Sequence, residues 1–350
     1  MIADTAVSIF PCPLIIITGR DLCVSRIRSN ISIPLRGLFS SQISNKIAFG
    51  GFLFINLMEL KYWVILTFLG AIWGSAFIFI KIAAPEFGAI GLVQMRLLIA
   101  SSVFVPILLR KKYIQLLPFT WHHSLVLAIT NNAIPFTLFS FGSFGADSNI
   151  LAILNATTAF NTMIIALIWL NESITLKQIF GLILGFIGVI ILVNPESSTT
   201  SMISAIFCLV GATCYSFSTV FIQKYSASTD KFVLVGWSIV FSSLIMMPIT
   251  AFNLPSEIPS SKALLSALWL GGISTGLAFF GYVYLIEKIG AVKTSTVAYF
   301  LPIFGIIWGA LFADEIITDG IIIGCAAILI GVFFATSNNR NNIKGEIHAN

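Results

Sequence analysis

The sequence predicts an all-helical integral membrane protein with ten transmembrane helices, arranged as two inverted five-helix repeats. Three observations lead to this prediction. Hydrophobic residues make up 57% of the 350 residues and charged residues only 9%, whereas soluble domains carry about 25% charged residues. Apolar runs of membrane length follow one another from residue 62 onward. Finally, the later part of each half carries matching residues in register.

Each apolar run is long enough to cross a bilayer as a helix. The hydrocarbon core is about 30 Å thick and a helix rises about 1.5 Å per residue, so a span needs about 20 mostly apolar residues. Backbone polar groups must be paired inside lipid, and a helix pairs them within itself. We expect spans at residues 62–82, 88–109, 123–145, 149–170, 175–193, 202–223, 232–252, 263–286, 292–313 and 318–336.

Basic residues predict the orientation of these spans. When the connections are numbered alternately along the chain, one set holds eleven Lys and Arg residues and the other holds only Lys81 and Lys262. Connections rich in Lys and Arg stay on the cytoplasmic side. We therefore expect both ends of the ten-helix unit to be cytoplasmic, in a cell (inner) membrane. The rich set is Lys61, Arg110, Lys111, Lys112, Lys177, Lys224, Lys231, Lys288, Lys293, Arg340 and Lys344.

The ends of the chain differ from its centre. Residues 1–57 hold two apolar patches that are too short to span, and they bear Arg and Ser with few acidic residues, faintly like a targeting peptide. Met58 stands directly before the first span. We expect residues 1–57 to be a start-site artefact or a disordered extension, and residues 338–350 to be a cytoplasmic tail.

An internal repeat divides the ten spans into two halves, residues 58–195 and 196–337. Residues 155–192 align with 298–335 without a gap. Each half contains five spans, and because five is odd the halves must insert with opposite orientation. Inverted repeats are an architecture of secondary transporters, whose substrate site lies near the midplane between the halves. The matched pairs include Glu172/Glu315, Thr175/Thr318, Gly181/Gly324, Gly188/Gly331 and Val189/Val332.

Several motifs resemble the drug/metabolite transporter superfamily, EamA type, over about residues 60–336. The resemblance implies ten helices and transport of small metabolites, often outward, without fixing a substrate. Two departures from the family pattern are present. The family's Leu-Gly-Glu is replaced by Leu170-Asn171-Glu172 in the first half and by Ala313-Asp314-Glu315 in the second half. The position in the first half that corresponds to Pro302 is occupied by Ala159. The motifs are Gly70-Ala71-Ile72-Trp73-Gly74-Ser75, Arg96, Tyr284, Gly290-Ala291, Ser295, Leu301-Pro302, Glu315, Gly324 and Gly331-Val332.

Arg96 is the first candidate substrate-binding residue. It lies about eight residues into the second expected span, where a guanidinium costs about 2.5 kcal/mol or more on insertion scales. Such a charge should face a cavity or a partner, so we interpret Arg96 as a contact for an anion or a carboxylate. The alternative is a packing role, in which it bonds carbonyl groups or extends to the membrane surface.

Four further residues are candidates for the lining of the substrate path. Asn155 and Thr158 share one face of the fourth span, Asn131 lies in the third span beside Pro135, and Tyr299 lies deep in the ninth span. Polar residues inside lipid either line a cavity or bond neighbouring helices. For Tyr299 the alternative is simple packing, the commoner role of a buried aromatic residue.

Small and acidic residues at the repeat positions are predicted to be structural. Gly181, Gly185 and Gly188 form a stripe on the fifth span, matched by Gly324 and Gly331 on the tenth. Such stripes allow close helix packing, so we expect a packing face or a surface for a second copy of the chain. We expect Glu172 and Glu315 each to sit at the opening of the next helix, near its positive dipole end.

These features predict a secondary transporter rather than an enzyme. The sequence shows no nucleophile–base constellation, no phosphate-binding loop and no metal-ligand cluster. We therefore expect no cofactor, no metal and no nucleic-acid partner, and a small polar or amphipathic metabolite as substrate, exported or exchanged across the bilayer by alternating access. A lipid-modifying intramembrane enzyme and a receptor-like scaffold remain the alternatives. Carboxylates after Met58 fall near span ends, which favours exchange or facilitated transport over proton coupling.

Overall fold

The computed structural model describes residues 60–169, 175–193, 200–225, 230–255, 257–289 and 294–336, and every regular element in these ranges is helical. The described residues belong to one compact unit, Met58–Asn350. The expectations for residues 1–57, Glu172 and residues 338–350 lie outside the described ranges.

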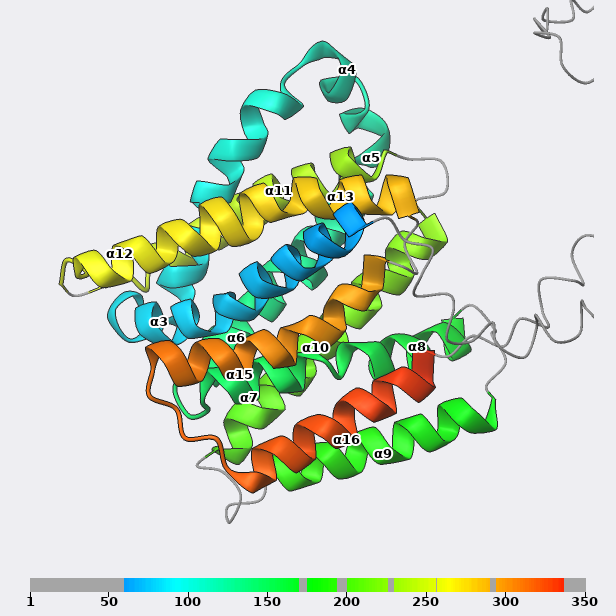
Figure 1. Cartoon of the computed structure of the whole chain (residues 1–350). Helices are drawn as coiled ribbons and strands as arrows, with labels where there is room; N and C mark the ends of the chain where they lie inside the picture. The colour runs from blue at the N-terminus through cyan, green and yellow to red at the C-terminus, as the bar shows by residue number, and fades with distance from the viewer. Residues whose placement is uncertain are drawn as a thin grey trace, which may run out of the picture. The chain divides into compact units, whose positions relative to one another are not determined.

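The first two expected spans form one long element, α3 (Leu60–Leu108), which bends at Gly88. Gly88 has φ 71° and ψ 159°, a backbone conformation that glycine adopts without the steric penalty of a side chain. At 49 residues and about 1.5 Å per residue, a straight α3 would be more than twice as long as the hydrocarbon core is thick. Gly88 therefore divides α3 into two arms (Figure 1), each long enough to cross a membrane.

The third and eighth expected spans are both interrupted by a π-helix. The third consists of α5 (Leu117–Leu127), η2 (Ala128–Ala133) and α6 (Ile134–Gly142). The eighth consists of α12 (Ser261–Leu268), η3 (Trp269–Leu277) and α13 (Ala278–Ile289). π-Helical turns are rare and are frequent at functional sites, so these two segments mark where the site should be sought.

The fourth and ninth expected spans are also irregular. The fourth is broken between α7 (Ser148–Asn155) and α8 (Thr158–Trp169). The ninth begins as a 3-10 helix, η4 (Ser295–Tyr299), and continues as α15 (Phe300–Phe312). Breaks of this kind free backbone groups that need other partners, and within a membrane they are tolerated where protein or a cavity surrounds them.

The remaining described helices are α4 (Lys111–Ile114), α9 (Leu176–Val193), α10 (Met202–Tyr225), α11 (Lys231–Ala251) and α16 (Asp319–Thr336). Seven helical stretches in the described residues are long and apolar enough to cross a membrane, with α3 counted once. Two shorter apolar helices, Val297–Phe312 and Asp319–Phe334, follow them. Length and composition therefore support a chain that crosses the bilayer several times.

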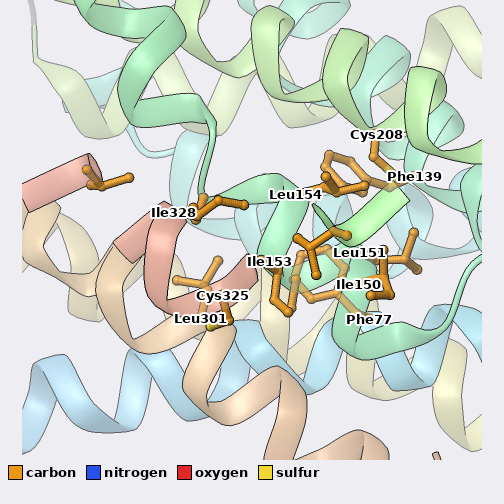
Figure 2. Close-up of a cluster of buried hydrophobic side chains, with 14 of the residues drawn as sticks. Phe77, Phe139, Ile150, Leu151, Ile153, Leu154, Cys208, Leu301, Cys325 and Ile328 are labelled. Atoms are coloured by element: carbon orange, nitrogen blue, oxygen red, sulfur yellow. The ribbon is translucent and has the colours of Figure 1, made fainter. Parts of the chain in front are cut away.

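The largest core cluster surrounds α7. All residues from Ser148 to Leu154 are buried, which requires neighbours on every side of this helix. Phe77 of α3, Phe139 of α6, Cys208 of α10 and Leu301 of α15 pack against it (Figure 2). Because α7 is central, the break that follows Asn155 lies in the interior of the helical unit.

Helices α9 and α16 lie side by side (Figure 1) and meet through glycines. A Cβ added to Gly188 would lie 2.8 Å from the carbonyl oxygen of Gly324, and one added to Gly331 would lie 2.7 Å from that of Gly181. A Cβ at Gly185 would lie 2.1 Å from the ring of Phe160. The glycine stripe is therefore used within the chain, and it is not the surface on which a second copy would dock.

We expect Gly331→Ala to lower the melting temperature of the purified protein. The new methyl group would press on the backbone of α9, and overpacking of this kind costs about 1–3 kcal/mol. Gly272→Ala is the matched control, because its Cβ would meet its nearest neighbour at 3.8 Å. Equal melting temperatures for the two variants, measured in detergent, would show that the α9–α16 contact is looser than described.

Candidate functional site

Arg96 lies in the second arm of α3 and is buried, with 8% of its surface exposed. Its Nε donates a hydrogen bond of 2.8 Å to the hydroxyl of Thr275 in η3, and that hydroxyl donates to the carbonyl of Leu270 at 2.8 Å. Gly271 makes this approach possible, since a Cβ there would lie 2.7 Å from the carbonyl oxygen of Arg96. The π-helical segment thus holds the guanidinium in one orientation.

An aromatic ring supports the other side of Arg96. The guanidinium carbon lies 3.7 Å from the ring centroid of Phe136 in α6, a close cation–π contact. Phe136 in turn lies 6.4 Å from the ring of Tyr215 in α10, and Tyr215 stacks on Phe139 at 6.0 Å. Aromatic side chains from two elements therefore form an apolar floor beside the cation.

The charge of Arg96 has no acidic partner in the described part of the chain. The ion pairs between described residues are those of Lys81 with Asp147 and with Glu315. Apart from its Nε, the guanidinium forms no hydrogen bond with a described residue. A guanidinium has five N–H donors, and a buried charge is costly unless it is paired. Arg96 therefore offers two amino groups for the bidentate binding of a carboxylate or another oxyanion.

Asn131 and its neighbour Asn132 lie in η2. Asn131 Nδ2 donates to Asn132 Oδ1 at 3.3 Å, and Asn132 Nδ2 donates to the hydroxyl of Ser238 in α11 at 3.0 Å. Asn132 is fully buried, whereas Asn131 is half-buried. Asn132 thus joins the third expected span to the seventh, a role that the sequence did not distinguish from that of Asn131.

Asn155 and Thr158 stand on the two sides of the break in the fourth expected span. The Thr158 hydroxyl donates to the carbonyl of Asn155 at 2.7 Å, and Ser216 of α10 donates to the carbonyl of Thr158 at 2.8 Å. The Thr158 hydroxyl therefore satisfies a carbonyl at the end of α7 that the break leaves without a helical partner, and Ser216 ties α10 to the start of α8. The buried Oδ1 of Asn155 accepts no hydrogen bond from the described residues.

Tyr299 is the last residue of η4 and is half-buried. It packs against the core cluster around α7, as do Trp73, Tyr215 and Tyr282. Among the hydrogen bonds of the described residues, none joins Arg96 to Asn131, Asn155 or Thr158. Hydrogen bonds thus do not join these candidates into one site, but Tyr215, which packs against the core cluster around α7, also contacts Phe136 beside Arg96.

Two buried donors were missed by the sequence analysis. The indole N–H of Trp237 in α11 and the hydroxyl of Ser274 in η3 are buried and find no acceptor or donor among the described residues. Trp237 matches Arg96 when Ser101-Ser102 is aligned with Ser242-Ser243, and Ser274 precedes Thr275. Such unpartnered buried groups call for a ligand or water. The correspondence between Trp237 and Arg96 in the repeat was the sequence signal that could have identified Trp237.

Glu315 corrects one expectation. It was predicted to sit at the opening of the next helix, α16, but its carboxylate accepts hydrogen bonds from the backbone N–H groups of Ser148 and Asn149, at 2.6 and 3.0 Å, at the start of α7. Lys81 lies 3.2 Å from the same carboxylate and also pairs with Asp147. The physical reason is the turn after α15, where the Glu315 N–H bonds back to Gly309.

A hollow of about 410 Å³ lies elsewhere, beside the Gly88 bend of α3, and Phe141 and Asn253 are among its lining residues. Glu86 in its wall accepts hydrogen bonds from the N–H and the hydroxyl of Ser260 at 2.5 and 2.8 Å. The Glu86 carboxylate is already hydrogen-bonded to Ser260 at the start of α12, so this hollow offers no unpaired charge to a substrate. Arg96 does offer one, and we therefore place the candidate site there.

Comparisons with known proteins agree on a transporter. The model of the EamA-like transporter family matches residues 61–194 and 202–337. A protein described as an uncharacterized transporter of Archaeoglobus fulgidus is 24% identical over 276 residues, which cover 78% of this chain and 98% of that protein. A probable amino-acid metabolite efflux pump of Salmonella typhimurium is 22% identical over 274 residues, covering 75% and 90% respectively.

A solved crystal structure shares the fold, with a TM-score of 0.56 and 14% sequence identity, and the match covers 79% of this chain and 98% of that one. The family model matches most of the chain in two stretches, and these stretches contain the helices that are long and apolar enough to cross a membrane. The chain therefore belongs to the EamA-like transporter family and is a multi-pass membrane transporter.

Proposed function

We propose that this chain is a secondary transporter that moves a small metabolite with a negatively charged group across the cell (inner) membrane by alternating access. The observation that carries the proposal is Arg96. Its guanidinium is buried in a membrane span, fixed by Thr275 and Phe136, and has no acidic partner among the described residues. Intramembrane charges of this kind mark substrate pathways, and a carboxylate on the substrate would supply the missing counter-charge.

The proposed architecture has ten spans in two inverted repeats, residues 58–195 and 196–337. The irregular segments support it. The alignment that pairs residues 155–192 with 298–335 places Asn155 opposite Ala298, so the break after α7 corresponds to the end of η4. Extended in the same register, it places η2 inside η3 and Asn132 opposite Thr275. Two halves that deviate from α-helix at matching positions fit the discontinuous helices of repeat transporters.

In the proposed mechanism the halves rock around a site near the midplane. Arg96 binds the negative group of the substrate, and Asn131, Asn155, Thr158 and Tyr299 line the path. Asn131 and Tyr299 are half-buried, and Asn155 carries a buried oxygen without a described donor. A substrate donor group, such as an amine or a hydroxyl, would satisfy that oxygen.

The proposed substrate is an amino-acid-like compound or a similar small amphipathic metabolite. The proposed transport is outward, or an exchange of one substrate for another. The apolar floor of Phe136 and Tyr215 beside the Arg96 cation suits a molecule with a carboxylate and an apolar part. The Salmonella typhimurium relative is named a probable amino-acid metabolite efflux pump, which supports this class and this direction.

A thermal-shift screen of the purified protein tests the proposal. Metabolites are offered as matched pairs, each carboxylate beside its amide, so that only the charge differs. A ligand present at 100 times its Kd stabilises the folded state by about 2.7 kcal/mol, and we expect at least one carboxylate to raise the melting temperature while its amide does not. Stabilisation by amides and carboxylates alike would remove Arg96 from the proposed role.

We also expect both termini of the helical unit to be cytoplasmic, because basic residues gather on one set of connections. Reporter fusions after residues 197 and 344 should report the outside and the inside of the cell respectively. The two fusions serve as controls for each other, because a reporter that is active on one side of the membrane only should be active in one fusion and inactive in the other. The same side for both would contradict the inverted five-plus-five arrangement.

A further inference from the structure

One group of side chains joins elements that the proposed repeats assign to different halves. Glu315, which follows α15 in the second half, caps the N-terminus of α7 in the first half and contacts Lys81 of α3. In the proposed orientation these residues lie at the outer end of the spans. We propose that Glu315 and Lys81 form the outer gate of the transport path, a clamp that is closed in this structure and releases when the site opens outward. The proposal rests on the alternating-access function above.

Two further contacts close the same end. Glu86, beside the bend of α3, accepts hydrogen bonds from Ser260 at the start of α12. The carbonyl oxygen of Gly145, after α6, accepts a hydrogen bond of 2.7 Å from the N–H of Ser201 before α10. Each contact again joins one half to the other. The connections of the outer end are thus tied together at three places, which is the arrangement of a closed gate.

The Glu315 clamp is strong because it is buried. Its side chain is 2% exposed, and its two oxygens accept two backbone N–H groups at a helix N-terminus as well as Lys81. The helix dipole and the ammonium both favour the ionised carboxylate. Their attraction is larger around the buried carboxylate than at the surface, and Lys81, whose side chain is 30% exposed, is the member of the clamp that water can reach.

The same place also carries a feature that disfavours closure. The hydroxyl of Ser148 and both side-chain polar atoms of Asn149 are buried and have no partner among the described residues. Unpaired polar groups raise the free energy of the state that buries them, and opening to water would satisfy them. A clamp that combines ionic capping with an unpaired hydroxyl and an unpaired amide favours a two-state element over a permanent brace.

Gly309 offers a second way to release the clamp. A Cβ added to Gly309 would lie 2.1 Å from Oε2 of Glu315, so Gly309→Ala would displace the carboxylate while its charge remains. Glu315→Gln removes the charge and keeps the size. The two variants therefore test the same contact by independent means.

The experiment measures access from outside to a cysteine behind the clamp. Phe77, one helical turn from Lys81 on α3 and buried, is replaced by Cys in a chain whose own cysteines are replaced by Ala. Whole cells are treated with a membrane-impermeant methanethiosulfonate. We expect Glu315→Gln and Gly309→Ala to speed labelling about tenfold by shifting the population toward the open state. Asp319→Asn and Gly272→Ala, which lie outside the clamp, should leave the labelling rate unchanged.

Unchanged labelling in both clamp variants, with folded protein, overturns the gate. If either variant fails to fold, Lys81→Met keeps the carboxylate cap and removes the cation, and an unchanged rate in that variant overturns the proposal equally. Labelling requires no substrate, so the gate and the proposed binding role of Arg96 can fail separately. A chain that labels faster when the clamp is removed but binds no metabolite would sustain the gate and reject the binding role of Arg96.

Discussion

Replacing Arg96 by Gln is expected to abolish binding of the carboxylate-bearing metabolite while the protein stays folded. Removing one partner of a buried charge pair costs about 2–5 kcal/mol, and each 1.4 kcal/mol is about tenfold in affinity, so the loss should be at least about 30-fold. Folding should survive because Arg96 pairs with no carboxylate among the described residues, so that the change orphans no buried anion. Ligand-induced melting shifts and calorimetry measure both effects.

Arg110→Gln is the matched control, because Arg110 is exposed just after α3. Thr275→Val removes the acceptor that orients Arg96 and should weaken binding by about tenfold or less, the net worth of one hydrogen bond. Full affinity in Arg96→Gln would disprove the assignment of this residue. Loss of folded protein in Arg96→Gln would instead show that its contacts with Phe136 and Thr275 are structural.

Uptake into proteoliposomes should depend on substrate on the far side of the membrane, whereas an imposed pH gradient alone should drive little uptake. Proton-coupled carriers place a titratable carboxyl or imidazole inside the membrane. In this chain each carboxylate whose side chain is described lies at a helix end, at the Gly88 bend or in a connection. They are Glu86, Asp147, Asp230, Glu257, Asp314, Glu315 and Asp319.

We therefore expect preloaded counter-substrate to raise uptake about tenfold or more, and a pH gradient alone to change it by no more than about twofold, in keeping with the absence of a dedicated proton site among those carboxylates. Liposomes that contain Arg96→Gln provide the background rate. Uptake driven by a pH gradient without counter-substrate would contradict the exchange mechanism, and Glu315 would then be the first carboxylate to test.

The sequence correctly predicted an all-helical chain with several apolar membrane-length helices and Arg96 within one of them, because both depend on local hydrophobicity. It did not predict what Arg96 touches. Thr275 lies 179 residues away in the chain. The helical periodicity places many polar residues on the same face of a helix, so it does not identify which of them contacts Arg96. The π-helical segments were not foreseen either, since the wider turn of η3 depends on its packing against α3, where Gly271 meets the carbonyl of Arg96.

Glu315 shows the same limit. The sequence predicted that it sits at the positive dipole end of the next helix, and it does cap a helix. The helix is α7 rather than α16, because the turn after α15 directs its side chain back toward α7. A motif can indicate the chemistry of a cap, whereas the choice of helix depends on tertiary structure.

The glycine contact between α9 and α16 has a mechanical consequence. Side chains that interdigitate can change rotamers and let two helices slide, but the backbones of Gly188 and Gly324 touch directly and have no rotamers to change. Close-packed contacts transmit displacement instead of absorbing it. The two helices come from opposite halves of the sequence, so this contact is a stiff joint. In the proposed alternating-access cycle, the proposed halves would turn about this joint and leave it intact, with the largest travel in the helices farthest from this pair.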